Sequence, residues 1–351
     1  MENRLIVSAN PHIRDKESIR RIMYTVNITL IPALIASYIF FGYQAILLTA
    51  VSILAAVGTE AAVQKFRGVK VTAMDGSAVL TGVLMAFHVS AGTPWWVVAL
   101  GSVFAIGIAK QAFGGLGYNF INPALAGRAF VMASWPVEMT STWTPASTAG
   151  NFAGKASEVA KQLGGSFDAL STATPLNVMK AANKIIVENA DADKVEQAKQ
   201  LILALKESYW DSFIGNTSGC IGETSELAIL LGGLFLIIRG YVNWRVPFFY
   251  ILTVAVMAWL LPNQDPLLHI LSGGLFIGAF YMATDMVTSP ITNKGMIIFA
   301  IGCGLLTMAI RVWGGYPEGV SYAILLMNLA APLIDRYTVP KKFGFNLAKK
   351  G

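Results

Sequence analysis

The sequence is poor in charge and in cysteine. Of its 351 residues only 13% are charged, whereas a soluble domain carries about 25%. This scarcity excludes an ordinary soluble enzyme. The two cysteines, Cys220 and Cys303, are far apart in the chain and match none of the paired spacings of zinc or iron–sulphur ligands, so we expect no metal site.

Apolar residues make up 55% of the chain and gather in ten runs. A helix of roughly twenty residues is about 30 Å long, the thickness of one hydrocarbon core. We therefore expect an all-α integral membrane protein with ten transmembrane helices. The first 21 residues are polar and lack an apolar core, which predicts that there is no cleavable signal peptide. The runs cover residues 22–41, 44–63, 77–89, 95–110, 120–135, 227–238, 246–261, 267–283, 294–310 and 320–334.

The basic residues predict the orientation. They flank the apolar runs, so the net charge of +6 indicates membrane topology and not nucleic-acid binding. Lys and Arg precede the first run, follow the second and follow the last, which places both termini in the cytoplasm. The long polar segment 136–226 holds seven Lys, no Arg and eleven Asp or Glu, and we expect this acidic insert on the outer side.

Short motifs recur in the two halves of the chain in the same order. Residues 80–87 are similar to 271–280, and residues 122–128 are similar to 328–336, although chance similarity between helices rich in Leu, Gly and Ala is the alternative. Each half has five runs, an odd number, so the second half is expected to be inverted, as in many transporters. The expected domains are a cytoplasmic segment 1–21, a first repeat 22–135, the extracytoplasmic insert 136–226, a second repeat 227–335 and a cytoplasmic tail 336–351.

Polar groups beside the apolar runs are the first candidate site residues. Asp75 can cap the third run, which is too short to cross the bilayer, and Asp285 and Glu60 also lie at or near membrane level. Acids at that depth are candidates for an ion path. Asn119 and Asn122 are three apart, on one face of an expected helix. Their amides either bind an uncharged heterocycle or cap and pack helices.

The stretch 168–175 is the most distinctive part of the insert. It contains Asp168, a cluster of hydroxyls that includes Ser171 and Thr174, and Pro175. A residue before proline is held extended, which predicts that the Thr174 side chain points outward, as suits a modification site. Clusters of Ser and Thr with Pro are also common in plain loops.

Together these motifs are specific. Residues 75–78, 114–115 with 119–130, 168–175 and 219–225 occur in this order along nearly the whole chain. In this respect the chain closely resembles the D-subunit family of the Rnf electron-transport complexes, whose paralogue is the B subunit of the sodium-pumping quinone reductase.

The resemblance implies a covalent flavin. Family members carry FMN joined by a phosphodiester bond to the last threonine of the pattern Asp, two variable residues, Ser or Thr, usually Gly, then Ala and Thr. Asp168, Ser171 and Thr174 match this pattern, while Thr172 stands where glycine is commonest. A separate flavin transferase uses FAD to attach the cofactor. Relatives also bind non-covalent riboflavin in the membrane, and the matching Asn119 and Asn122 are the candidate contacts.

The function that the resemblance implies is electron relay in a complex of the bacterial cytoplasmic membrane. That complex passes electrons between ferredoxin and NAD and exports Na⁺ or H⁺, so this subunit is not catalytic alone. Its expected partners are a second covalent-flavin subunit, iron–sulphur subunits and the lipid bilayer, and no nucleic acid. The inverted repeat alone equally supports a channel or transporter for a small polar solute. Only the 168–174 pattern separates the two functions, and a pure scaffold would leave the insert without a purpose.

Overall fold

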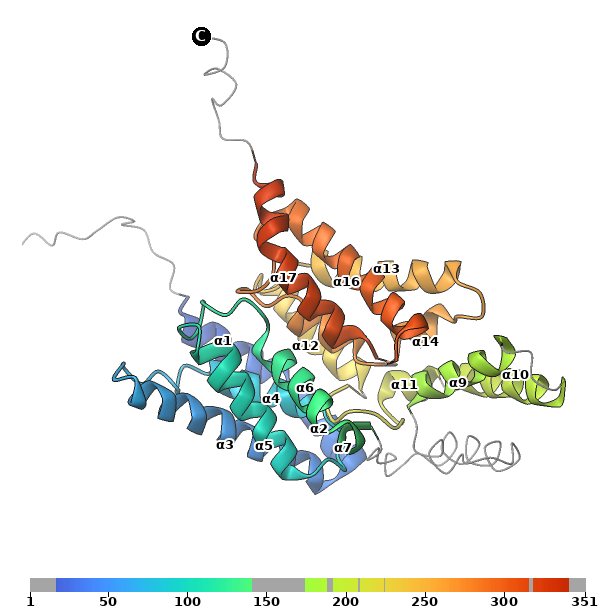
Figure 1. The fold of residues 1–351 in the computed structure, drawn as a ribbon, viewed down its shortest axis with the longest axis horizontal. Coiled ribbons are helices and arrows are strands. Elements are labelled where there is room, and N and C mark those ends of the chain that lie inside the picture. Colours follow the sequence, from blue (N-terminus) through green and yellow to red (C-terminus); the bar gives the residue numbers. More distant parts are fainter. Residues whose placement is uncertain are drawn as a thin grey trace, which may run out of the picture.

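The regular secondary structure of the described residues consists of helices. The computed structural model describes residues 17–140, 174–187, 192–207, 209–223, 225–315 and 318–340, and these ranges contain no strand (Figure 1). Before the insert come α1 (Ile19–Thr29), α2 (Ile31–Phe41), α3 (Tyr43–Phe66), α4 (Ser77–Phe87), α5 (Trp95–Phe104), the π-helix η1 (Ala105–Gln111), α6 (Pro123–Ser134) and α7 (Pro136–Thr140). The following elements are α9 (Pro175–Val187), α10 (Ala192–Glu207), α11 (Tyr209–Ile214), α12 (Glu226–Ile238), α13 (Arg245–Leu260), α14 (Pro266–Ile270), α15 (Leu275–Ile277), the π-helix η3 (Gly278–Met282), α16 (Asn293–Trp313) and α17 (Val320–Thr338).

Each of the ten apolar runs contains helix, and the protein is a multi-pass membrane protein. Within the described part of the chain, three segments are long and apolar enough to cross a membrane by their length and composition, namely Ile19–Phe41, Tyr43–Phe66 and Asn293–Trp313. Other apolar helices are shorter. The third run forms only the 11 residues of α4, as its length predicts.

The eighth run does not form the continuous helix expected over 267–283. α14 ends at Ile270, and the chain resumes as α15 at Leu275. Between them Gly273 and Gly274 have φ values of +70° and +65°, a left-handed conformation that glycine adopts far more readily than other residues. A Cβ atom on Gly274 would also lie 2.5 Å from Cδ of Glu223, so the break brings a carboxyl group close to the backbone.

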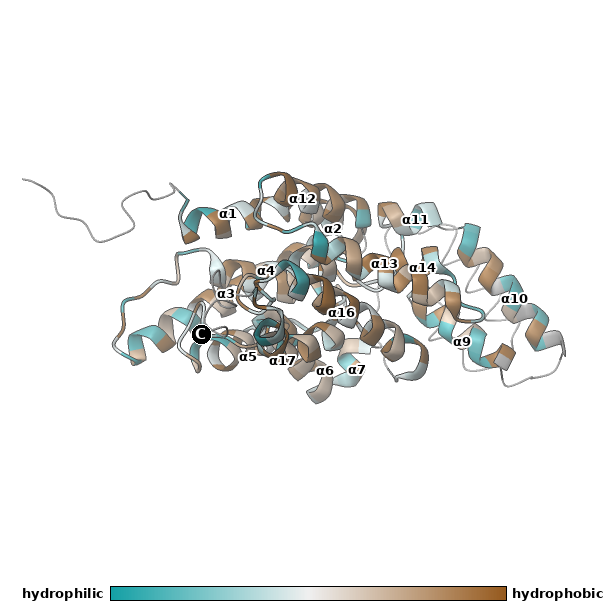
Figure 2. Cartoon of the chain, turned by 90° about the horizontal axis from the view of Figure 1, so that it is seen from above, coloured by the Kyte–Doolittle hydropathy of each residue, from teal (hydrophilic) through white to brown (hydrophobic). Residues whose placement is uncertain are grey.

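The helices form two groups that meet along several elements. In Figure 1, α1–α7 form the blue-to-green group and α12–α17 the yellow-to-red group, while α9 and α10 extend to one side. The groups are in contact through α12 with α1 and α2, and through α17 with α6. Figure 2 shows mostly hydrophobic colouring on α12 and α16 and mixed colouring on α9 and α10.

Small residues let the backbones within one group approach closely. A Cβ atom on Gly127 of α6 would lie 2.5 Å from the carbonyl oxygen of Gly101 in α5, and one on Gly82 of α4 would lie 2.8 Å from Cα of Ile53 in α3. Such contacts drive helix association in lipid, where apolar burial gives no advantage. These close contacts fix the positions of α4 and α6, and both helices contribute residues to the candidate site.

Candidate functional site

A cavity lies between the two groups of helices and brings several predicted site residues together. We call it the asparagine cavity. Its polar lining includes Asn119, Asn122 and Asp285, and its remaining walls are mainly apolar. Its volume is about 110 Å³, below the roughly 300–1,000 Å³ of ordinary ligand pockets. A ring system would therefore enter only by displacing flexible lining side chains such as Met23 and Met286.

Asn119 offers the asparagine cavity an unused hydrogen-bond acceptor. The residue is 5% exposed and lies in the loop before α6. Its Nδ2 donates to the carbonyl oxygen of Ile121 at 3.1 Å, whereas its Oδ1 is buried and has no donor among the described residues. A buried acceptor left without a donor costs about 1–3 kcal/mol. An N–H group of an uncharged ligand would satisfy it.

Asn122 is already used as a helix cap. Its Oδ1 accepts from the backbone N–H groups of Ala124 and Leu125 at 3.0 and 3.4 Å. Because α6 begins at Pro123, the expectation that Asn119 and Asn122 share one helical face is wrong. Both nevertheless line the same cavity, and Asn119 is the one with hydrogen-bonding capacity to spare.

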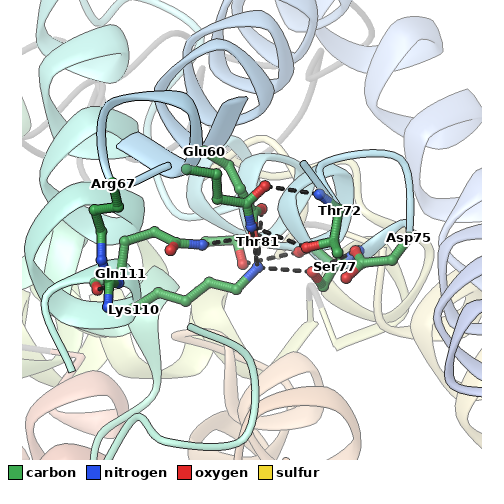
Figure 3. A network of polar contacts seen from close by, with 9 residues as sticks. Glu60, Arg67, Thr72, Asp75, Ser77, Thr81, Lys110 and Gln111 are labelled. Carbon is green, nitrogen blue, oxygen red and sulfur yellow. Dashed lines mark hydrogen bonds and ion pairs between the residues drawn. The ribbon is translucent and has the colours of Figure 1, made fainter. Parts of the chain in front are cut away.

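A buried ion pair reaches the cavity wall through its lysine. Lys110 and Glu60 are each 1% exposed, and Lys110 Nζ donates to Glu60 Oε2 at 2.9 Å and to Ser77 Oγ at 2.7 Å (Figure 3). Gln111 Nε2 donates to Glu60 Oε1 at 2.8 Å. Lys110 and Gln111 belong to η1, and π-helical turns of this kind often occur at functional sites.

Asp75 joins this network through Ser77. The Asp75 Oδ1 accepts from both the backbone N–H and the hydroxyl of Ser77, at 2.8 and 2.6 Å. It thereby satisfies the first backbone N–H of α4, although the N-cap position itself is Gly76 and not Asp75 as expected. Asp75, Ser77, Lys110 and Glu60 form one hydrogen-bonded chain, and its two middle members, Ser77 and Lys110, line the asparagine cavity (Figure 3).

Asp285 lies on the part of the cavity wall contributed by the second group of helices. Its Oδ2 accepts from the hydroxyl of Thr288 at 3.0 Å, and its Oδ1 accepts from the N–H of Val287 at 3.4 Å. Removal from water raises the pKa of the Asp285 carboxyl. The two acids predicted for an ion path, Asp75 and Asp285, are thus both connected with the asparagine cavity.

Thr174 lies elsewhere, at the start of α9. It is 7% exposed, so the prediction that its side chain points outward is wrong. Its Oγ1 accepts from the N–H of Asn177 at 3.4 Å, which makes it a weak cap of the helix. The other two residues of the acceptor pattern, Asp168 and Ser171, lie outside the described residues.

A second cavity borders α9 and is lined by Asn177. We call it the α9 cavity. Its volume is about 390 Å³, within the range of ligand pockets, and its wall includes the buried Arg128 and Ser321 and the half-buried Tyr322. A helix N-terminus and a nearby guanidinium both favour a phosphate group. The surroundings of Thr174 therefore fit a phosphodiester-linked cofactor.

Two residues of the asparagine cavity were not identified from the sequence. Lys110 ends the fourth apolar run and Ser77 begins the third, positions that do not mark either as a site residue. The signal for Lys110 was present, since an acid in the second apolar run, Glu60, needs a cationic partner if it lies at membrane depth.

The chain is similar to known proteins along almost its full length. Residues 6–344 match the model of the NQR2, RnfD, RnfE family. The D subunit of a Na⁺-translocating ferredoxin:NAD⁺ oxidoreductase complex from Acetobacterium woodii is 47% identical over 99% of this chain and 98% of its own. The D subunit of the proton-translocating complex from Clostridium ljungdahlii is 43% identical over 98% and 97%. The D subunit of an ion-translocating oxidoreductase complex from Stutzerimonas stutzeri is 39% identical over 95% of each chain.

Proposed function

The chain belongs to the NQR2, RnfD, RnfE family, and from this membership we propose that it is the D subunit of an ion-translocating ferredoxin:NAD⁺ oxidoreductase complex. The observation that carries the proposal is the 47% identity over 350 residues to a relative of that name. A channel or transporter without a redox role is the weaker alternative, since none of these three relatives is described as one.

The proposed function has a direct genetic test. Membranes from a strain that lacks this chain should lose ferredoxin-dependent NAD reduction and regain it when the wild-type chain is supplied. Undiminished activity in the deletion strain would contradict the proposal.

We propose that Thr174 carries FMN, which supplies one-electron transfer when bound. The match to the acceptor pattern, the start of α9 and the α9 cavity support this assignment. Thr174 would hold the phosphodiester at the N-terminus of α9, and Arg128, which lines the α9 cavity, would supply a positive charge near it. The iron–sulphur centres of the complex would belong to other subunits, because two buried cysteines cannot supply the four thiolates of a cluster.

We propose that riboflavin binds in the asparagine cavity, with Asn119 Oδ1 accepting from a ring N–H. Replacing Asn119 by Leu removes this acceptor. A hydrogen bond is worth about 0.5–1.5 kcal/mol net, so riboflavin that co-purifies should fall by up to roughly tenfold, while flavin bound to Thr174 is retained. Extraction followed by chromatography measures both.

Asn122→Ala is the matched control for Asn119→Leu. Loss of the α6 cap should lower stability by about 0.5–2 kcal/mol, with a smaller effect on riboflavin, because the Asn122 amide oxygen is already occupied by backbone N–H groups. An unchanged riboflavin content in Asn119→Leu would show that Asn119 only stabilises the loop before α6 and does not bind riboflavin.

We further propose ten membrane spans in two inverted five-helix repeats, with the 136–226 insert outside and both termini in the cytoplasm of a bacterial cell. One contact supports the repeat. Asn122 and Asn328 occupy matching places in the two similar motifs, and the side-chain oxygen of Asn328, with its amide turned to suit its neighbours, accepts from the Asn122 N–H at 3.1 Å. Equivalent positions of inverted repeats are expected to meet in this way near the pseudo-two-fold axis.

The orientation can be checked by cysteine labelling. A cysteine in place of the exposed Glu207 of α10 should react with an impermeant thiol reagent in intact cells, whereas one in place of Lys70 should react only after permeabilisation. The natural Cys220 and Cys303 are buried and give little background. The opposite labelling pattern would reverse the orientation.

A further inference from the structure

Three buried carboxyl groups meet at the boundary between the two groups of helices, near the break between α14 and α15. Glu223 precedes α12, Glu226 begins it, and Glu318 precedes α17, and they are 7%, 1% and 8% exposed. Carboxylate oxygens of Glu223 and Glu318 and the sulphur of Cys220 all lie within 4.8 Å of one another. Glu226 follows Glu223 by three residues at the start of α12, close enough for Glu223 and Arg311 to influence its carboxyl, but outside the 4.8 Å group. We call Glu223, Glu226 and Glu318 the carboxyl cluster.

Two guanidinium groups face the carboxyl cluster. Arg128 forms an ion pair with Glu318 and lies 3.5 Å from Glu223 Oε1. Arg311 donates to backbone carbonyl oxygens, including those of His269 at 2.6 Å and Glu318 at 2.8 Å. Among the described residues, two positive charges thus face three carboxyl groups.

The remaining titratable side chains near the cluster add no positive charge. Burial raises the pKa of the Cys220 thiol well above its usual range, which keeps the sulphur protonated and neutral. His269 Nδ1 faces a guanidinium nitrogen of Arg311 at 3.4 Å, an arrangement that requires a lone pair on Nδ1. His88 Nδ1 lies 2.7 Å from the carbonyl oxygen of Leu84 and donates to it, which in a neutral ring leaves the lone pair on Nε2.

Unpartnered acceptors concentrate in this region. Both carboxyl oxygens of Glu226, Glu223 Oε1, Ser272 Oγ and His88 Nε2 are buried without a hydrogen-bond partner in the described part of the chain. His88 Nε2 and Glu223 Oε1 face each other at 3.7 Å. Neither atom receives a hydrogen bond, and the Arg128 guanidinium lies 3.5 Å from Glu223 Oε1 without donating to it.

We propose that the carboxyl cluster is a binding site for one monovalent cation, a sodium ion or a proton, and that Glu226, whose two buried oxygens have no partner among the described residues, is the group that takes it up. Three carboxylates and two guanidinium groups together carry one net negative charge, which one monovalent cation neutralises. A divalent ion would leave a net positive charge buried. Carboxylate and hydroxyl oxygens suit a hard cation. The inference rests on the proposed function, under which the complex moves such a cation, and adds a site on this subunit.

The cluster is reached from the α9 cavity, whose wall includes Arg128 and Glu318. The same two residues therefore border both the proposed flavin position and the proposed cation site. A negative charge in the α9 cavity would attract the Arg128 guanidinium, which forms ion pairs with Glu318 and Glu223, and would thereby weaken those ion pairs.

The test compares the purified wild-type complex with Glu226→Gln, which keeps the side-chain shape and removes the charge. Binding of radioactive sodium counts the ions held per complex, and infrared spectroscopy detects the carbonyl stretch of a protonated carboxyl group. We expect Glu226→Gln to lose either one bound sodium ion or that carbonyl band. Glu226→Asp, which restores the charge, should recover the loss at least in part, and the exposed Glu207→Gln should behave as wild type.

Sodium stoichiometry and carbonyl bands that are both unchanged in Glu226→Gln would overturn the cation site. Flavin content and ferredoxin-dependent NAD reduction are measured on the same wild-type preparation. A wild-type complex that lacks flavin or that activity contradicts the proposed function, whereas a flavin-loaded, active complex with no Glu226-dependent cation contradicts only the site.

Discussion

A complex that carries Thr174→Val is expected to contain no covalently bound FMN and to pass no electrons through this subunit. Valine keeps the shape of threonine but has no oxygen to form the phosphodiester. Its effect on folding should be small, because the hydroxyl makes only a 3.4 Å contact with the Asn177 N–H, so the cost should lie near the low end of the about 0.5–2 kcal/mol of a lost helix cap. Fluorescence of the band after denaturing electrophoresis measures attachment, and ferredoxin-dependent NAD reduction measures electron flow.

Neighbouring hydroxyls provide the controls for Thr174→Val. Ser171→Ala and Thr172→Val should keep at least part of the flavin, since an enzyme must activate the acceptor and neighbours do not substitute freely. Thr174→Ser retains a hydroxyl and should keep part of it as well. A Thr174→Val protein that still fluoresces after denaturation, or a Thr172→Val protein that alone loses the flavin, would show that another hydroxyl is the acceptor.

The helices were largely predictable because apolar runs in a membrane protein have few alternatives to helix. The break in the eighth run could not be predicted from the sequence. Gly82 and Gly274 look alike in sequence, yet Gly82 packs against the α3 backbone inside α4, and Gly274 adopts a left-handed conformation that ends a helix. Glycine is frequent in membrane helices for the first reason, so composition alone does not reveal the second.

Local sequence patterns determine only some features of the candidate site. The spacing of Asn119 and Asn122 predicted a shared helical face, but Asn before Pro is the signature of a helix start, and α6 begins at Pro123. The proline after Thr174 restricts its backbone, whereas its burial depends on what packs around α9. That Asn119, Lys110 and Asp285 line one cavity follows from packing between distant segments, which no local pattern contains.

Lys110→Met is expected to destabilise the protein strongly by leaving Glu60 ionised and buried without a cation. Both partners are 1% exposed, and loss of one member of a buried ion pair costs about 3–5 kcal/mol. The thermal unfolding midpoint of the purified protein in detergent should fall by several degrees, since roughly 1 kcal/mol shifts the midpoint of a soluble domain of 150–250 residues by about 2–4 °C. Riboflavin content should fall with it, because Lys110 lines the asparagine cavity.

The double variant Glu60→Gln with Lys110→Met separates charge from packing. It removes both charges together and keeps an amide oxygen at position 60 that can accept from Gln111 Nε2, the group that donates to Glu60 Oε1 at 2.8 Å. Replacing both members of a buried pair is often close to neutral, so most of the lost stability should return. Lys70→Met, at an exposed site, should change the midpoint little. A double variant no more stable than Lys110→Met would mean that the lysine contributes through packing of its stem rather than through its charge.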